Sequence, residues 1–248
     1  MEAMILAAGE GTRLRPLTDR MPKALVPVRG RPLLAHVMER LVAAGATRIV
    51  VNTCPHARQV AAYLDGHTPP GVEVLVSHEP DGPYETGGGL LAAASLFRGD
   101  GPILLHNVDV LSRIPLDDLL AAHRRARTQE GEPVATLAVQ DRGAARALLF
   151  DDVGLLGRES RGPGGQVTES ERVRERVGAE RRWSFAGIHV VEPAILELCE
   201  RTGRFSIRTL YLDLARQGHR IQPLDVTASE WFEVGTPERL AEAEARLG

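Results

Sequence analysis

The chain has 248 residues, a formal net charge of −3 and a pI near 6.3, with 43% hydrophobic and 25% charged residues. This length supports one large domain with a sizeable core, and the balanced charge argues against nucleic acid or an anionic membrane as a partner. No run approaches the roughly 18 apolar residues that span a bilayer, so we expect a cytoplasmic protein. Cys54 and Cys199 lack metal-ligand spacing and are expected to be free thiols.

Apolar runs and helical patterns alternate along the first half of the chain. Strands of about six residues separated by longer helices are typical of parallel βαβ units, which predicts an α/β fold with a sheet covered on both faces. The expected strands are Ala3–Ala8, Thr47–Asn52, Val72–Ser77 and Pro102–Asn107, and the expected helices are Pro32–Ala44, Pro55–Leu64 and Gly88–Phe97.

The second half is less regular. Residues 154–182 are rich in Gly, Arg and Glu, which predicts a solvent-side hairpin or flap rather than a linker. We therefore expect one domain over residues 1–248, and the chain shows no β-helix repeat after its last helix. The expected helices are Pro115–Arg127, Pro193–Arg201, Ser206–Gln217 and Pro237–Leu247, and the expected strands are Val134–Gln140, Ala145–Phe150, Ser184–Val191, Arg220–Asp225 and Glu230–Val234.

A glycine-rich loop directly follows the first expected strand. Gly9 and Gly11 would let backbone N–H groups turn toward phosphate oxygens, at the strand edge where open α/β sheets bind ligands. Among 29 arginines the chain has one lysine, Lys23, just beyond this loop. A lysine is a compact point charge, whereas arginine is a planar fork, so a crowded phosphate site favours the lysine. Leu14 stands where a dinucleotide motif would have its third glycine.

The whole run from Gly9 to Thr18, followed by Pro22-Lys23, resembles the sugar-phosphate nucleotidyltransferases. The resemblance implies a glycosyltransferase A-like, Rossmann-like fold with three α/β/α layers and a mostly parallel, mixed central sheet. It also implies transfer of a nucleotidyl group from a nucleoside triphosphate to a sugar 1-phosphate, with release of pyrophosphate. By the same resemblance Arg13 and Lys23 are the catalytic residues. The expected nucleotide-binding residues in this loop are Leu6, Ala7, Ala8, Gly9, Gly11, Thr12 and Arg13.

Asp109 follows the fourth expected strand, at the place where the resemblance implies a Mg²⁺ ligand. The run Trp231–Glu238 resembles the family's Trp-x-Asp-Val/Ile-Gly-x-Pro-Glu element, but Glu233 stands where Asp is expected. Because Mg²⁺ demands near-octahedral geometry, the extra methylene could relocate the ion, add a water or weaken binding. Glu233 is the expected second ligand, and His106 is expected to be a packed strand-end residue.

The segment from His78 to Gly89 ends in Glu-Thr-Gly-Gly-Gly, a form that resembles N-acetylmuramate 1-phosphate uridylyltransferases and mannose 1-phosphate guanylyltransferase-like proteins. In relatives this loop touches the base and places the sugar, so Gly87 and Gly88 are expected to bind the nucleotide. Glu79 either accepts a hydrogen bond from a base N–H or is a solvated loop acid. The expected acceptor-binding residues are Lys23, Glu85, Asn107, Gly187 and Glu233.

Two alternatives remain open from the sequence. The acceptor could be a phosphorylated alcohol such as phosphocholine, used with CTP. The chain could instead be a nucleotide or sugar-nucleotide sensor, because Glu233 is altered and the Glu-Lys-Pro element of many relatives is missing. An arginine such as Arg182 is the expected substitute for that second lysine, and Trp183 could stack on a sugar. The sequence is compatible with a monomer or a homodimer.

Overall fold

Strand β1 (Glu2–Leu6) is buried over its whole length and lies at the centre of the main sheet. The computed structural model describes residues 1–54, 56–128 and 131–246. β1 pairs in parallel with β4 (Arg48–Thr53) on one side and with β6 (Ile103–Asn107) on the other. β5 (Glu73–His78) extends the sheet beyond β4, also in parallel. Parallel strands place their carboxyl ends at one edge of the sheet, where β1 meets the glycine-rich loop.

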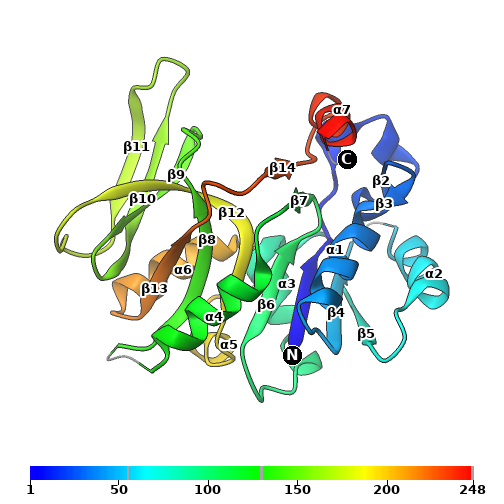
Figure 1. Ribbon diagram of the computed structural model, residues 1–248, viewed down its shortest axis with the longest axis horizontal. Coiled ribbons are helices and arrows are strands. Elements are labelled where there is room, and N and C mark those ends of the chain that lie inside the picture. Colours follow the sequence, from blue (N-terminus) through cyan, green and yellow to red (C-terminus); the bar gives the residue numbers. More distant parts are fainter. Residues whose placement is uncertain (55, 129–130, 247–248) are drawn as a thin grey trace.

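The other half of the main sheet is mixed. β12 (Arg181–Val191) runs antiparallel to β6, and β8 (Pro133–Gln140) runs antiparallel to β12. β13 (Arg220–Asp225) completes the sheet in parallel to β8. The order β5-β4-β1-β6-β12-β8-β13 (Figure 1) confirms the expected mostly parallel, mixed sheet.

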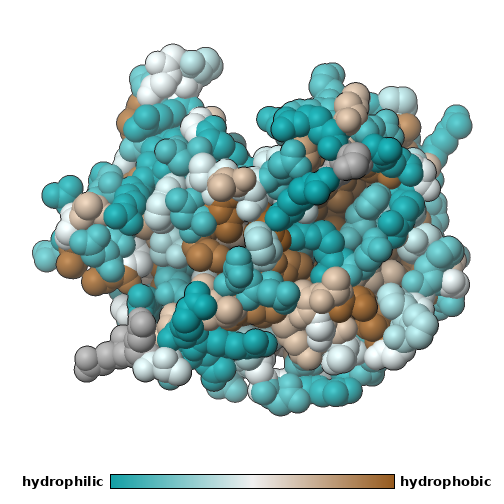
Figure 2. Space-filling model, viewed as in Figure 1, coloured by the Kyte–Doolittle hydropathy of each residue, from teal (hydrophilic) through white to brown (hydrophobic). Residues whose placement is uncertain are grey.

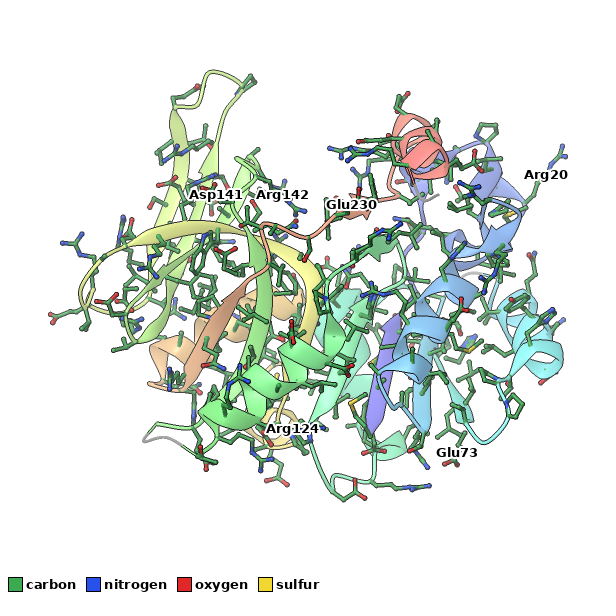
Figure 3. All side chains as sticks on the ribbon, viewed as in Figure 1. Arg20, Glu73, Arg124, Asp141, Arg142 and Glu230 are labelled. Atoms are coloured by element: carbon green, nitrogen blue, oxygen red, sulfur yellow. The ribbon has the colours of Figure 1, made fainter. Side chains whose placement is uncertain are left out.

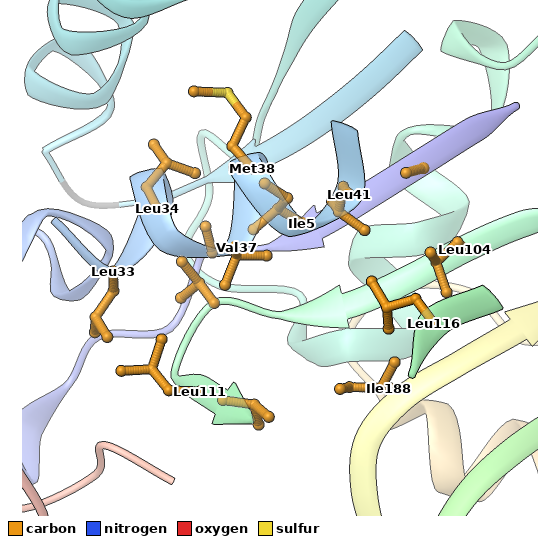
Figure 4. Packing of buried hydrophobic residues seen from close by; sticks show 14 of the residues in the cluster. Ile5, Leu33, Leu34, Val37, Met38, Leu41, Leu104, Leu111, Leu116 and Ile188 are labelled. Carbon is orange, nitrogen blue, oxygen red and sulfur yellow. The ribbon is translucent and has the colours of Figure 1, made fainter. Parts of the chain in front are cut away.

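Helices cover both faces of this sheet because alternate strand residues point to opposite sides. Ala3 and Ile5 of β1 belong to one hydrophobic cluster, and Met4 and Leu6 belong to the other. Helices α1 (Leu33–Ala43), α2 (Ala57–His67), α4 (Leu116–Ala126) and α7 (Pro237–Arg246) contribute to the first cluster, and α3 (Glu85–Ala92), α5 (Ile195–Leu198) and α6 (Ile207–Arg216) to the second. Figure 4 shows α1 packing Leu33, Leu34, Val37, Met38 and Leu41 into the first cluster. The three-layer α/β/α prediction is confirmed.

A smaller antiparallel extension is built from β9 (Arg146–Asp151), β10 (Gly154–Arg161) and β11 (Val167–Arg172), joined to the first residues of β12. The segment expected to be a hairpin or flap contains the β10–β11 hairpin, which projects from the body in Figure 1. The return from β11 is anchored at the buried carboxylate of Asp151, which receives two hydrogen bonds from Arg174, at 2.6 and 2.7 Å. Burial would raise the pKa of Asp151, but bonds from Arg174 and from the backbone of Val177 and Val153 lower that pKa to about 2.

Some elements end differently from the sequence expectation. α2 continues through Gly66, and the Thr68 hydroxyl donates to the Leu64 carbonyl at 2.8 Å after the last turn. α3 begins at Glu85 rather than at Gly88, and only α5 forms within the expected helix over residues 193–201. The expected boundaries at Pro55 and Leu247 lie outside the described residues. The short strands β2 (Pro27–Val28), β3 (Arg31–Pro32), β7 (Val110–Ser112) and β14 (Trp231–Glu233) form two further pairs. Among the described helices, none has the length and apolar character that crossing a membrane requires.

Two fully buried histidines make folding sensitive to acid. Burial, and then the neighbouring His106, lower the pKa of His189 to about 3, and burial followed by Arg40 lowers the pKa of His106 to about 4. Nε2 of each ring has no hydrogen-bond partner within the described residues. Both rings are therefore neutral in the folded chain, as expected for a packed His106.

We expect the free energy of unfolding to fall as the pH falls below 6.5. Each ring has a lower pKa when folded than the ordinary 6.5, so the unfolded chain binds more protons between these values. At about 1.4 kcal/mol per pKa unit, each histidine should lower the free energy of unfolding by about 2 kcal/mol at pH 5. Urea unfolding measured from pH 5 to 7 checks this. The slope of the unfolding free energy against pH gives the number of protons taken up on unfolding, and this number should be smaller by about one in His189→Gln. The exposed histidine variant His67→Gln is the control, and an unchanged slope in His189→Gln would contradict the prediction.

Candidate active site

A cavity of about 340 Å³ lies beyond the carboxyl ends of β1 and β6. On the face shown in Figure 2 the molecule is notched between the β10–β11 hairpin and α7. Asp141 and Arg142, which follow β8, lie on the hairpin side of this notch and Glu230 on the other (Figure 3). The cavity is lined by Leu6, Ala8, Gly9, Glu10, Gly11, Thr12, Arg13, Lys23, Asn52, Pro83, Glu85, Thr86, Asn107, Val108, Asp109, Arg204 and Gly235.

One wall of the cavity is a row of unused backbone donors. Residues 8–13 all line the cavity, and none of their N–H groups donates a hydrogen bond within the described part of the chain. The next amide along, that of Leu14, is already bonded to the carbonyl of Gly11 at 2.8 Å. Free N–H groups at a strand-to-turn junction form an anion-binding concavity. The loop thus has the donors that phosphate oxygens require.

Gly11 fixes the shape of this loop. Its φ of +64° is left-handed, and a Cβ there would lie 2.9 Å from Cγ2 of Thr18 and 3.1 Å from Cβ of Lys23. The Thr18 hydroxyl donates to the Gly11 carbonyl at 2.8 Å. At Gly9, by contrast, a Cβ would meet no atom within 4 Å, so the space over Gly9 is open to a ligand.

The single lysine lies at the floor of the cavity beside the expected metal ligand. Nζ of Lys23 donates to Oδ2 of Asp109 at 2.5 Å, and the two side chains are 10% and 18% exposed. Asp109 follows β6, and its carbonyl accepts from the backbone N–H of Val234 at 2.7 Å. Residues 86 positions apart in sequence therefore form a largely desolvated ion pair in the wall of the cavity. Such a pair is strong where its geometry is good, and removal of one partner leaves the other charge uncompensated.

Strand β14 brings Glu233 close to Asp109. Glu233 pairs with Val110 in the β14–β7 ladder, directly after Asp109. Its carboxylate is 43% exposed and lies 3.4 Å from the guanidinium of Arg13, which is 66% exposed. Glu233 itself is not part of the cavity lining, although the nearby Gly235 is. Each of the two expected metal ligands thus faces one of the two expected catalytic cations.

These two carboxylates fit a magnesium ion. Within the described residues no group of three or more His, Cys, Asp or Glu side chains could hold a metal. Mg²⁺ does not need such a cage, since it is commonly held by one or two carboxylates together with waters and substrate phosphate oxygens. Asp109 and Glu233, on strands that pair with each other, provide that donor set beside a phosphate-binding loop.

Glu79 is not the solvated acid that the sequence left open. Its side chain is buried, with the residue 1% exposed, and it does not line the cavity. One carboxylate oxygen accepts from Nδ2 of Asn52 at 2.7 Å, and the other accepts from the backbone N–H of Tyr84 at 2.6 Å. Oδ1 of Asn52 in turn accepts from the backbone N–H of Ala7 at 2.7 Å. Glu79 therefore has no oxygen directed to a base in this structure, and it holds the ends of β1, β4 and β5 together.

Three glycines expected near ligands pack against protein instead. A Cβ on Gly87 would lie 2.4 Å from the ring of Phe205, and one on Gly88 would lie 2.2 Å from the carbonyl of Gly203. The N–H groups of Gly87 and Gly88 donate to the Phe205 carbonyl, so they are not available to an anion. A Cβ on Gly187, whose φ is +76°, would lie 2.8 Å from Nδ2 of Asn107. The space beside Gly187 is thus filled by Asn107, which lines the cavity.

Arg204 is a cavity residue that the sequence did not reveal. Its Nε lies 3.2 Å from Oε1 of Glu85, a non-glycine residue with a φ of +60° at the start of α3. Arg182, the expected substitute for a second lysine, instead donates to Glu159 at 2.9 Å and to the Ala144 carbonyl at 2.7 Å. An isolated arginine in a loop carries no signal that it will meet Glu85, 119 residues away. The contact between Arg204 and Glu85 depends on the packing of α3 against α6, which the sequence does not show.

Comparisons with known proteins show the family to which the chain belongs. Residues 2–147 match the family model described as nucleotidyl transferase. The chain is 33% identical to N-acetylmuramate alpha-1-phosphate uridylyltransferase of Neisseria meningitidis serogroup B, across 100% of this chain and 99% of that protein. The chain belongs to the sugar-phosphate nucleotidyltransferase family. The family match confirms the resemblance noted in the sequence. Members of this family are transferases.

Other relatives and solved structures agree with the family and the fold. Mannose-1-phosphate guanylyltransferase catalytic subunit beta of Drosophila pseudoobscura is 30% identical over 95% of this chain and 59% of that protein. The UDP-glucose pyrophosphorylase structure from Acinetobacter baumanii superposes with a TM-score of 0.76 at 18% identity, over 100% of this chain and 93% of that one. The inositol-1-phosphate CTP transferase of T. maritima gives a TM-score of 0.74 at 18% identity, over 99% and 95%. At these identities the structures support the fold alone.

Proposed function

We propose that this nucleotidyltransferase joins a nucleoside triphosphate to a sugar 1-phosphate, releasing pyrophosphate. The observation that carries the proposal is the row of free N–H groups of residues 8–13, which lines the same cavity as the Lys23–Asp109 pair. The backbone N–H groups could donate hydrogen bonds to a polyphosphate. Lys23 and Asp109 would provide a cation and a carboxylate beside the phosphate on which negative charge develops.

The chemistry asks little covalent help from the protein. An oxygen of the acceptor phosphate forms a bond to the α-phosphorus, and the bond from that phosphorus to the bridging oxygen breaks, so the electron pair leaves with pyrophosphate. Catalysis then consists of alignment and of stabilising the charge on the departing group. In this proposal Arg13, largely exposed at the loop, would contact the pyrophosphate side, and the buried Lys23 would contact the reacting phosphates.

Mg²⁺ is the cofactor we propose, held by Asp109 and Glu233. When bound, it would supply neutralisation of phosphate charge. The Glu233 side chain is 43% exposed, Asp109 lines the cavity, and each contacts a cation that a phosphate could also bind. Lys23 and Arg13 would then be released from carboxylates to contact phosphate.

Pyrophosphate release tests the proposal. Purified protein is mixed with Mg²⁺, each of UTP, GTP, CTP and dTTP, and a panel of acceptors. The panel contains N-acetylmuramate 1-phosphate and mannose 1-phosphate, which the names of the relatives suggest, together with glucose 1-phosphate and phosphocholine. Turnover with a sugar 1-phosphate supports the proposal. Turnover with phosphocholine alone, or nucleotide binding without turnover on any acceptor, would replace it with the alcohol-phosphate enzyme or the sensor.

Glu233→Asp should keep or raise activity, because it restores the shorter carboxylate at a half-exposed position on β14. Glu233→Gln should raise the Mg²⁺ concentration for half-maximal rate about ten-fold or more, since one charged ligand is lost. Titration of Mg²⁺ in the pyrophosphate assay measures both. The exposed glutamate variant Glu242→Gln on α7 is the matched control. A large loss in Glu233→Asp would show that the site is built for Glu.

A further inference from the structure

A second cavity, of about 590 Å³, is lined by β14 and by the segment that follows β8. Trp231 and Glu233 both line it, and so do Asp141 and Arg142, which are labelled in Figure 3. Alternate residues of a strand point to opposite sides. Trp231 and Glu233 therefore share one face of β14, while Phe232, which is 3% exposed, packs into the core on the other face.

The position of β14 depends on contacts of its side chains. The strand has three residues, and within the described part of the chain its only ladder is with β7. An isolated pair of strands is marginally stable at best in water. β14 also lies in the connection between β13 and α7, apart from the main sheet (Figure 1). Phe232 holds one face of this strand, and the contacts of Trp231 hold the face that carries Glu233.

Trp231 is held both at its edge and on its face. Its Nε1 donates to the carbonyl of Ala186 on β12 at 2.8 Å. The central guanidinium carbon of Arg142 lies 3.4 Å from the centroid of the indole ring. A guanidinium at this distance stacks on an aromatic face and is attracted by it. Loss of Arg142 would therefore leave the indole attached only through its N–H group.

Arg142 is itself held by the two strands beside it. One Nη atom donates to the carbonyl of Phe185 on β12 at 3.0 Å, and the other donates to Oε1 of Gln140 on β8 at 3.4 Å. Gln140 is buried, and its Nε2 donates to the carbonyls of Val226 and Ser229 at 3.1 and 2.9 Å. The main sheet thus sets the place of the guanidinium, and the guanidinium limits where the indole can lie.

We infer that Arg142 is a positioning residue that holds Trp231 and so keeps the Glu233 carboxylate in the place that divalent-cation binding requires. This inference rests on the proposed function, because it assumes that Asp109 and Glu233 bind the ion. The carbonyl of Asp109 accepts from the N–H of Val234 at 2.7 Å, so the backbone of β14 is also linked to the other ligand. Because Mg²⁺ demands near-ideal geometry, a displaced β14 weakens metal binding and leaves the glycine-rich loop unchanged.

Metal binding without turnover tests this. Mn²⁺ replaces Mg²⁺ as the probe, and water-proton relaxation measures the enzyme-bound ion in the presence of a UTP or GTP analogue whose α,β-bridging oxygen is a methylene group. Arg142→Gln should raise the Mn²⁺ concentration at half-saturation about ten-fold, as is typical when a group that orients a metal ligand is lost. Affinity for the analogue in EDTA should not change. Arg142→Lys should fall in between, since an ammonium still stacks on the indole but lacks the fork.

A double variant separates positioning from general destabilisation. In a Glu233→Gln background, Arg142→Gln should have no further effect on the Mn²⁺ affinity, because the carboxylate that it positions is already gone. Arg181→Gln is the matched control, since it removes a guanidinium 5.8 Å from the ring of the chain's other tryptophan, Trp183. This control should keep the wild-type affinity. An equal loss in both backgrounds, or no loss in Arg142→Gln, would overturn the inference.

The inference and the proposed function fail on different results. If the wild type turns over a sugar 1-phosphate and Arg142→Gln binds Mn²⁺ as well as the wild type does, the proposed function stands and the role of Arg142 is rejected. If no acceptor is turned over, the proposed function fails, while a ten-fold weaker Mn²⁺ affinity that depends on Glu233 still supports the positioning role. Mn²⁺ binding that is the same in wild type and Glu233→Gln would overturn the inference.

Discussion

Lys23→Arg should lower kcat on the order of 10²–10³-fold although it conserves charge, as expected for loss of a pre-organised electrostatic contact. Lys23 is 10% exposed, and its Nζ reaches Asp109 at 2.5 Å along a side chain held beside Gly11 and Thr18. A guanidinium is broader, and its fork would displace Asp109 or the loop. Steady-state pyrophosphate release at saturating nucleotide measures the loss.

Lys23→Met separates charge from shape, because it keeps the unbranched stem and removes the ammonium. Its kcat should fall at least as far as that of Lys23→Arg. Circular dichroism melting shows whether either variant is unfolded. Near-normal turnover in Lys23→Arg would mean that any cation suffices at this position, and the assigned role of Lys23 would be wrong.

Asp109→Asn should reduce kcat/KM on the order of 10²–10³-fold, because it removes the charge of the proposed metal ligand and the counter-charge of Lys23 together. The amide can still accept one hydrogen bond from Lys23, but the ammonium loses its counter-charge, so the free energy of unfolding should fall as well. Activity against Mg²⁺ concentration is the measurement, since a lost ligand moves the whole titration to higher concentration.

The exposed aspartate variant Asp118→Asn on α4 controls for loss of a carboxylate elsewhere. If Asp109→Asn were active with an unchanged Mg²⁺ requirement, the metal would have to be held elsewhere. A combined Lys23→Met and Asp109→Asn variant should lose less than the two single losses multiplied, because the two residues form one pair.

The position of the glycine-rich loop and Asp109 at one cavity could be predicted because its determinants are local. Gly9, Gly11 and Arg13 lie within a few residues of the end of β1, and one strand-to-loop transition sets their direction. Asp109 follows the neighbouring parallel strand β6, so sheet geometry alone brings it to the same edge. The alternation of strands and helices likewise predicted the central sheet and the helical layers on its two faces.

The base and acceptor side could not be predicted because its determinants are contacts distant in sequence. The Gly-Gly-Gly run resembles a ligand cradle, but the space at Gly87 and Gly88 is taken by residues 203–205. Gly187 makes room for Asn107 in the same way. Arg204 occupies its place only because α6 packs against α3. No spacing in the sequence encodes that packing.

The buried carboxyl of Glu79 bears on how base preference could change within this scaffold. Gly89 leaves space for it, since a Cβ there would lie 2.5 Å from Asn52 and 2.7 Å from Glu79. Replacing Glu79 would leave Asn52 and the Tyr84 amide unsatisfied, and it would loosen the attachment of the phosphate loop through Ala7. A substitution of Glu79 that was meant to change nucleotide preference would therefore lower the stability of the fold.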